Sequence, residues 1–71
     1  MKVKLVFIGG FDKKEEVLDV KGKKRYSELL ESIGINPETV VIVKGKTPIP
    51  TDALVEEGEV KVIRVISGGL F

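Results

Sequence analysis

Apolar residues recur along the chain with two different periods, which predicts β-strands and a single helix. Residues 2–8, KVKLVFI, place Val3, Leu5 and Phe7 on one face of a first strand. Residues 15–20, EEVLDV, have the pattern of a second strand. The intervening GGFDKK contains the glycine and aspartate residues that are typical of a turn. Two strand patterns this close together predict an antiparallel hairpin.

The helical period follows in residues 26–33, YSELLESI. Its apolar residues fall at i, i+3, i+4 and i+7 and therefore form one stripe, made of Tyr26, Leu29, Leu30 and Ile33. Gly34 is placed to end this helix in the left-handed conformation, and Pro37 prevents the helix from resuming. The residue that caps the start is left open, because Ser27 could lie either at the cap or inside the first turn.

The second half of the chain contains two further strand patterns. Residues 39–44, TVVIVK, are rich in β-branched side chains and predict a central strand. The two prolines of GKTPIP, residues 45–50, exclude a central strand there and predict a turn with a short edge segment. Residues 51–58 form a connecting loop, and residues 59–66, EVKVIRVI, predict the last strand.

The order hairpin, helix, strand, edge segment and strand predicts a two-layer α+β domain. One helix covers one face of a four- or five-stranded sheet, and the other face is exposed to solvent. In the central strand we expect Val41 and Val43 to face the helix and Ile42 to face solvent, while Leu54 fills the core from the loop. The expected core residues are Val3, Leu5, Leu18, Leu29, Leu30, Ile33, Val41, Val43, Leu54, Val60 and Val62.

Length and composition exclude several classes of protein. A chain of 71 residues is one domain, and a domain of this size buries only about 60% of its unfolded surface, which leaves little room for an internal active site. The sequence contains no cysteine and no histidine, so disulfides, thiolate catalysis, the usual zinc sites and the commonest general base are excluded. We expect no catalytic residue, no bound cofactor and no metal site.

Charge and hydropathy argue against nucleic acid and membrane as partners. The net charge is +1, from 12 basic and 11 acidic residues. The basic run KGKKR, residues 21–25, has no interleaved aromatic residue to stack on bases, so we interpret it as a solvated turn before the helix. The acidic Asp52, Glu56, Glu57 and Glu59 lack the spacing of a calcium loop. No apolar run approaches the roughly 20 residues of a membrane span, and no signal peptide is apparent, so we expect a cytoplasmic protein.

Three stretches in the right order resemble the ubiquitin-like sulfur carriers. SELLESIGINPETVVIVKG, residues 27–45, is similar to the helix, turn and central strand of that family. TPIPTDALVEEG, residues 47–58, resembles its edge strand and acidic loop, and EVKVIRVISGG, residues 59–69, resembles its last strand and terminus. The family includes the thiamine-biosynthesis carrier, the small subunit of molybdopterin synthase and the small archaeal modifier proteins. The first 20 residues fit the family hairpin but carry no distinctive motif.

The resemblance implies a β-grasp fold over residues 1–66 and a reactive tail over residues 67–71. In the family, an ATP-dependent activating enzyme adenylates the carboxylate of the last glycine, here Gly69 after Gly68. The product is converted to a thiocarboxylate for a sulfur-accepting biosynthetic enzyme, or is transferred to a lysine of an acceptor protein. Glycines suit such a tail because they have no Cβ and let the backbone pass close to the nucleotide. The ATP belongs to the activating partner, and this chain supplies no catalytic residue.

A docking surface for the activating enzyme is expected on the sheet face away from the helix. The strand assignments place Ile42 and Ile63 there beside Lys44 and Lys61, and Arg64 adds a further basic residue. An apolar pair with a basic rim is typical of a protein-binding surface.

Gly69 is joined to Leu70, so its carboxyl carbon is part of an amide and is not free to react. We therefore expect a protease to remove Leu70 and Phe71 before activation. Two alternatives remain open. The domain is a protein-binding module that never reacts, or, less in keeping with its balanced charge, it binds RNA. The sequence does not separate sulfur transfer from protein conjugation, and it does not indicate the oligomeric state.

Overall fold

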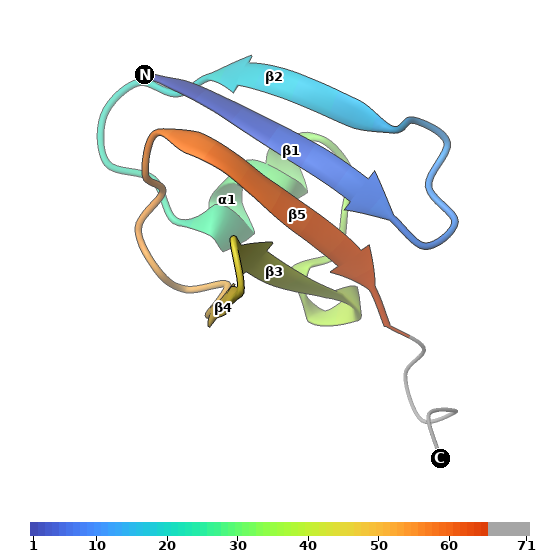
Figure 1. Cartoon of the computed structure of the whole chain (residues 1–71). Helices are drawn as coiled ribbons and strands as arrows, with labels where there is room; N and C mark the ends of the chain where they lie inside the picture. Colours follow the sequence, from blue (N-terminus) through green and yellow to red (C-terminus); the bar gives the residue numbers. More distant parts are fainter. Residues whose placement is uncertain (66–71) are drawn as a thin grey trace.

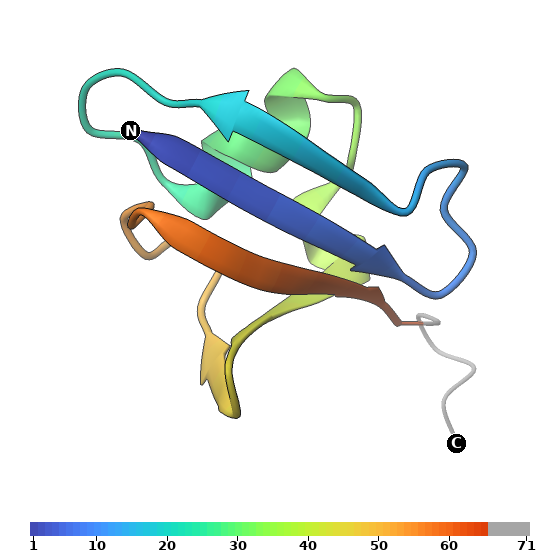
Figure 2. The ribbon, with the colours of Figure 1, turned by 45° about the horizontal axis from the view of Figure 1, so that its top comes forward.

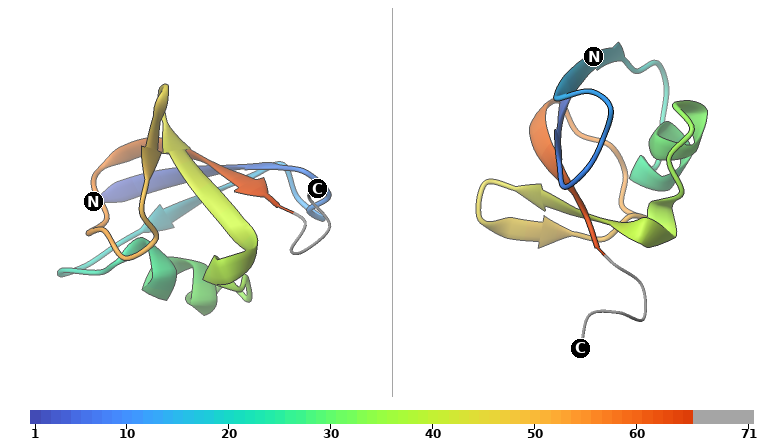
Figure 3. Two further views of the ribbon diagram at one scale, coloured as in Figure 1. Left: turned by 90° about the horizontal axis from the view of Figure 1, so that it is seen from below. Right: turned by 90° about the vertical axis from the view of Figure 1, so that its right-hand side faces the viewer.

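The computed structural model of the chain describes residues 1–65. The strands are β1 (Lys2–Ile8), β2 (Glu15–Asp19), β3 (Val40–Lys44), β4 (Thr47–Ile49) and β5 (Gly58–Arg64), and the helices are α1 (Tyr26–Ser32) and the single-turn η1 (Pro37–Thr39). The strands form one sheet in the order β2-β1-β5-β3-β4. The helix α1 lies across one face of this sheet (Figures 1 and 3). The predicted α+β, ubiquitin-like β-grasp fold is confirmed.

The two central strands, β1 and β5, run parallel to each other, as the family resemblance implies. The hairpin of β1 and β2 is antiparallel, and so are the pairings of β3 with β5 and with β4. Figure 2 shows β2, β1 and β5 side by side in front of the helix. The predicted turn after β1 contains Gly9 and Gly10 at φ values of 99° and 88°. Side chains with a Cβ rarely adopt this conformation, so the two glycines let the hairpin turn.

The helix α1 ends as predicted but begins differently. Its N-cap is Arg25, whose backbone N–H donates a 3.0 Å hydrogen bond to the Glu28 carboxylate. Ser27 therefore lies inside the first turn. Gly34 follows the helix at a φ of 83°, the left-handed conformation expected of it. The buried face carries Tyr26, Leu29 and Leu30, and the predicted apolar stripe is confirmed.

The core lies between this stripe and the inner faces of the strands. Its buried residues are Val3, Leu5, Phe7, Val20, Tyr26, Leu29, Leu30, Val40, Ile42, Val55, Val60 and Val62, with Leu18 and Ile33 packed partly buried against them. The prediction that Leu54 fills the core from the loop is wrong. Leu54 is 50% exposed, and the next residue, Val55, is buried instead. The loop backbone sets this choice, because Val55 donates to the Lys24 carbonyl (2.7 Å) and Tyr26 donates to the Ala53 carbonyl (3.0 Å).

The prediction for the faces of β3 is wrong by one residue. Ile42 pairs with Val62, and both are fully buried beneath the helix. Val41, which was expected in the core, pairs with Ile63 on the opposite face and is 39% exposed. Val43 also belongs to that outer face and is half-buried. Because side chains alternate along a strand, this single shift moves every β3 residue to the other face.

Candidate docking surface

The sheet face turned away from the helix carries a compact group of apolar side chains on its three central strands. Strand pairing sets Ile8 beside Ile63 and Ile63 beside Val41, which gives one row across β1, β5 and β3. The next row contains Val6, Lys61 and Val43. We call these six residues the outer patch. The viewer of Figure 1 looks onto this face, since the helix lies behind the sheet.

The exposure of the outer patch is unusual for a sheet face in contact with water. Ile8 is 41% exposed and Val41 is 39% exposed, while Val6, Val43 and Ile63 are half-buried by their neighbours. Single exposed apolar residues are common on protein surfaces and need no explanation. Contiguous apolar side chains, in contrast, commonly mark a protein-binding surface. Lys61 is exposed among them and supplies a positive charge within the patch.

Ion pairs border the outer patch at the end farther from the C-terminus. Lys4 lies between two carboxylates, 3.4 Å from Glu15 and 3.7 Å from Glu59. Lys4 and Glu59 pair across β1 and β5 in the next row of the same face, while Glu15 lies beside Val6 at the β2 side of the patch. Surface ion pairs contribute little stability, so their effect here is to end the apolar area with a polar border.

Two residues predicted for this surface lie elsewhere. Ile42 is fully buried under the helix and cannot contact a partner in the folded domain, so its assignment to a docking site is wrong. Lys44 shares the inward orientation of Ile42 at the end of β3 and turns toward the loop before β5. Its ammonium group lies 3.3 Å from the Glu56 carboxylate and donates to the Glu57 carbonyl at 3.3 Å. The expectation that Lys44 lies beside Lys61 is therefore wrong.

Arg64 also leaves the outer patch, because it follows Ile63 on the strand and points to the other face. Its guanidinium lies 4.3 Å from the centroid of the Phe11 ring and donates to the Gly10 carbonyl at 3.3 Å. Phe11 in turn packs against Phe7, with 5.0 Å between the ring centroids. Arg64 thus connects the end of β5 to the β1–β2 turn through these two contacts. The expected contact of Arg64 with a partner stays a prediction.

The chain leaves the sheet beside the outer patch. The last described backbone contact is the hydrogen bond from Val65 N–H to the Thr39 carbonyl, at 2.9 Å. Ile63 is two residues earlier, in the row of the patch nearest this end. The predicted reactive residues Gly68 and Gly69, and the expected tail of residues 67–71, lie outside the described residues. Gly69 is the fourth residue after Val65 along the chain, a span of at most about 14 Å.

Within residues 1–65, the structure contains no group of three acidic side chains that could hold a metal ion. The acidic side chains of the loop before β5 and of Glu59 at the start of β5 are exposed, and Glu56 and Glu59 pair with lysines as described above. No helix among the described residues is long and apolar enough to cross a membrane. The basic run of residues 21–25 is an exposed loop between β2 and α1, as the sequence predicts.

Sequence reasoning found Lys61 and Ile63 but missed their apolar neighbours on the outer patch, which are Val6, Ile8, Val41 and Val43. Alternation within residues 2–8 already places Val6 and Ile8 on the face opposite Val3 and Leu5, so that signal was present in the sequence. Val41 carries no such signal, because both faces of its strand are apolar.

Comparison with known proteins agrees with the predicted family. A family model described as small archaeal modifier protein 2 matches residues 1–66. An uncharacterised protein from Archaeoglobus fulgidus is 62% identical over 69 residues, covering 97% of this chain and 100% of the relative. The sulfur carrier protein TtuB from Thermus thermophilus is 43% identical over 53 residues, covering 73% and 82% of the two chains.

Small archaeal modifier protein 2 from Haloferax volcanii is 33% identical over 64 residues, covering 90% of this chain and 94% of the relative. The named relatives are a carrier and a modifier rather than enzymes. The chain belongs to the small archaeal modifier protein 2 family, among the ubiquitin-like sulfur carriers and modifiers.

Proposed function

We propose that this protein acts through the carboxylate of Gly69, which an ATP-dependent activating enzyme adenylates after Leu70 and Phe71 have been removed. The observation that carries the proposal is the match of the modifier family over residues 1–66, followed after Ser67 by Gly68 and Gly69. The activated chain then delivers sulfur to a biosynthetic enzyme or is attached to an acceptor protein.

The chemistry needs a carbonyl carbon with a good leaving group. An oxygen of the Gly69 carboxylate attacks the α-phosphorus of ATP, pyrophosphate leaves, and an acyl-adenylate forms. Hydrosulfide then attacks the carbonyl carbon, the bond from that carbon to the AMP oxygen breaks, and a thiocarboxylate forms with loss of AMP and a proton. A lysine amine that attacks instead gives an isopeptide bond and loses a proton. The described residues of this chain need only present the tail, and the partner supplies the catalysis and excludes water.

The outer patch supports this proposal because it gives the activating enzyme a surface near the tail. Ile63 and Val41 lie in the row closest to Val65, and Gly69 lies at most about 14 Å beyond Val65 along an extended chain. A single partner protein can therefore cover these residues and also contact the Gly69 carbonyl. Burying the apolar side chains of the patch would stabilise the complex, and Lys61 would favour an acidic contact.

Processing is required because the amide between Gly69 and Leu70 offers no carboxylate oxygen to attack ATP. Two bulky apolar side chains would also obstruct a channel shaped for glycine. A protease that cuts after Gly69 removes both obstacles and cuts no residue of the described sheet.

Pyrophosphate release tests the proposal. The full chain and a chain ending at Gly69 are each incubated with ATP and the host activating enzyme. We expect release only with the chain ending at Gly69, and a chain ending at Gly68 serves as the matched control. Release with the full chain would contradict the processing step. If neither chain reacts while the folded domain still binds a partner through the outer patch, the protein is a non-conjugating binding module.

A further inference from the structure

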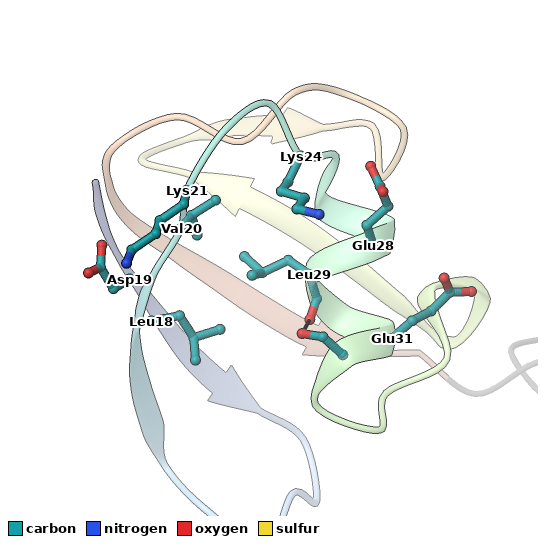
Figure 4. Close-up of a pocket in the computed structure, with 9 residues that line it drawn as sticks. Leu18, Asp19, Val20, Lys21, Lys24, Glu28, Leu29 and Glu31 are labelled. Atoms are coloured by element: carbon teal, nitrogen blue, oxygen red, sulfur yellow. Dashed lines mark hydrogen bonds between the residues drawn. The ribbon is translucent and has the colours of Figure 1, made fainter.

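A groove separates the edge strand β2 from helix α1, and none of the residues that line it belongs to the outer patch. Its volume is about 440 Å³, and its apolar lining comes from Leu18 and Val20 on the strand side and Leu29 on the helix. Figure 4 shows Leu29 extending from the helix between the two walls. The nearby Ser32 hydroxyl donates its hydrogen bond within the helix, to the Leu29 carbonyl at 2.6 Å.

The strand that forms one wall has an open edge. β2 is the outermost strand of the sheet and pairs only with β1 among the described elements. Hydrogen bonds from Val20 to the Met1 carbonyl and from Phe7 to the Lys14 carbonyl fix which β2 residues face β1. In an antiparallel pair, bonded and non-bonded residues alternate. The backbone N–H and carbonyl groups of Glu15, Val17 and Asp19 therefore point outward, where an added strand could bond to them.

The groove has opposite charges at its two ends. Lys21 and Lys24 lie at one end, and Glu31 lies at the other (Figure 4). Among residues 1–65, neither lysine lies within 4.0 Å of a carboxylate oxygen. Within the same range, Lys2, Lys4, Lys13 and Lys44 do, while Lys14, Lys23, Lys46 and Lys61 do not. Two carboxylates also line the lysine end. That of Glu28 accepts the backbone N–H of Arg25 at 3.0 Å, and that of Asp19 pairs with the N-terminal ammonium group at 3.4 Å and with Lys2 at 4.0 Å. The lysine end is thus available to an acidic partner.

A second copy of this chain is a poor occupant. An antiparallel pair of two β2 strands centred on Val17 would place Glu15 of one copy opposite Asp19 of the other, twice. Like charges directly opposite each other destabilise strand pairing. Charged residues on an edge strand commonly protect it from self-association in this way.

We infer that the groove between β2 and α1 binds an extended peptide segment of another protein, as an added antiparallel or parallel strand on β2. Alternate side chains of this segment are apolar and contact Leu18, Val20 and Leu29. Acidic residues at one end of the segment lie against Lys21 and Lys24. Backbone hydrogen bonds supply affinity, and the apolar and acidic positions supply specificity. This inference goes beyond the proposed function, because it concerns recognition of the folded domain without use of the tail.

Titration of the isotopically labelled full chain with synthetic peptides tests this inference by NMR. The probes carry valine at every second position with serine between, and a run of aspartates at either end. The control peptide has lysines in place of the aspartates. We expect saturable shifts in residues 15–24 and in α1, slowed amide exchange at Val17 and Asp19, and binding that weakens as salt is added. The lysine peptide should bind at least tenfold more weakly.

Two variants make the test specific. Val17→Pro removes one outward N–H without touching the pairing with β1, and should weaken binding at least tenfold relative to Val17→Ala, which keeps that donor. Should Val17→Pro fail to fold, the double variant Lys21→Glu with Lys24→Glu decides the matter. It should reject the aspartate peptide and accept the lysine peptide, whereas Lys46→Glu on the distant β3–β4 turn should change neither affinity.

Three results would overturn the inference. The first is the absence of saturable binding by either aspartate peptide. The second is binding that maps to Val41 and Ile63 on the outer patch. The third is protection of the β2 amides that increases with protein concentration when no peptide is present, which would identify a second copy as the occupant. None of these measurements uses the tail or the activating enzyme, so their failure is distinguishable from failure of the proposed function.

Discussion

Ile42 and its neighbour Val41 differ sharply in what their truncation should cost, although the two side chains differ by only one methylene group. Ile42 has no exposed surface and packs with Val62 under the helix, whereas Val41 is 39% exposed on the outer patch. Ile42→Ala should lower the free energy of unfolding by about 2–5 kcal/mol, because it removes buried methyl groups and leaves a cavity. Val41→Ala should lower it by about 1 kcal/mol or less.

The expected loss at Ile42 is large relative to the stability of so small a domain. A chain of 71 residues has a free energy of unfolding of about 4–11 kcal/mol, at about 0.05–0.15 kcal/mol per residue. Ile42→Ala therefore removes between about a fifth of this stability and all of it. The outcome depends on how far the surrounding side chains relax into the cavity.

Urea denaturation followed by circular dichroism measures this difference. With an m-value of about 1 kcal/mol/M, Ile42→Ala should move the midpoint down by about 2–5 M, and Val41→Ala by about 1 M or less. Equal m-values for the variants would show that both unfold from the same compact state. A larger loss for Val41→Ala than for Ile42→Ala would refute the assignment of the two faces of β3, and with it the composition of the outer patch.

Three further predictions concern the docking surface, the β1–β2 turn and the end of the helix. Ile63→Asp and Lys61→Glu should each reduce the rate of adenylation at least tenfold at limiting activating enzyme while the urea midpoint changes little; unfolding by Ile63→Asp would instead assign that side chain to the core. Phe11→Ala should destabilise the domain by about 0.5–1 kcal/mol in urea because it removes the ring beneath Arg64, and an unchanged midpoint would show that this contact is without effect. Gly34→Ala should cost about 1–2 kcal/mol of unfolding free energy because Gly34 has a φ of 83°, and a more stable variant would contradict the left-handed end of the helix.

The parts of the fold that could be predicted from the sequence are those with a clear period. Val3, Leu5 and Phe7 alternate with polar or outward residues, and the stripe from Tyr26 to Leu30 has helical spacing, so both were assigned correctly. Residues 40–43 are apolar at every position, and neither a strand period nor propensity indicates which face is buried. The pairing of Ile42 with Val62 decides it, and pairing is a property of the assembled sheet.

The same limit applies to the loop before β5 and to the groove on β2. Ala53, Leu54 and Val55 form an apolar run without a period, and hydrogen bonds to the start of α1 select Val55 for the core. The groove depends on how the helix lies against an edge strand, which local sequence does not encode. The assignment of Gly68 and Gly69 to a reactive tail rests on residue type and on the family resemblance, and it stays a prediction because both lie outside the described residues.

The central claim is that the Gly69 carboxylate is the reacting group of this protein. Intact mass spectrometry of the chain ending at Gly69, after incubation with ATP, the activating enzyme and a sulfur donor, tests it most directly. The account predicts replacement of one carboxylate oxygen by sulfur, located at Gly69 by fragmentation, or a Gly69 isopeptide bond to a lysine of an added acceptor protein. An unchanged mass under conditions in which the activating enzyme modifies another carrier, or a modification located anywhere other than Gly69, would contradict the account.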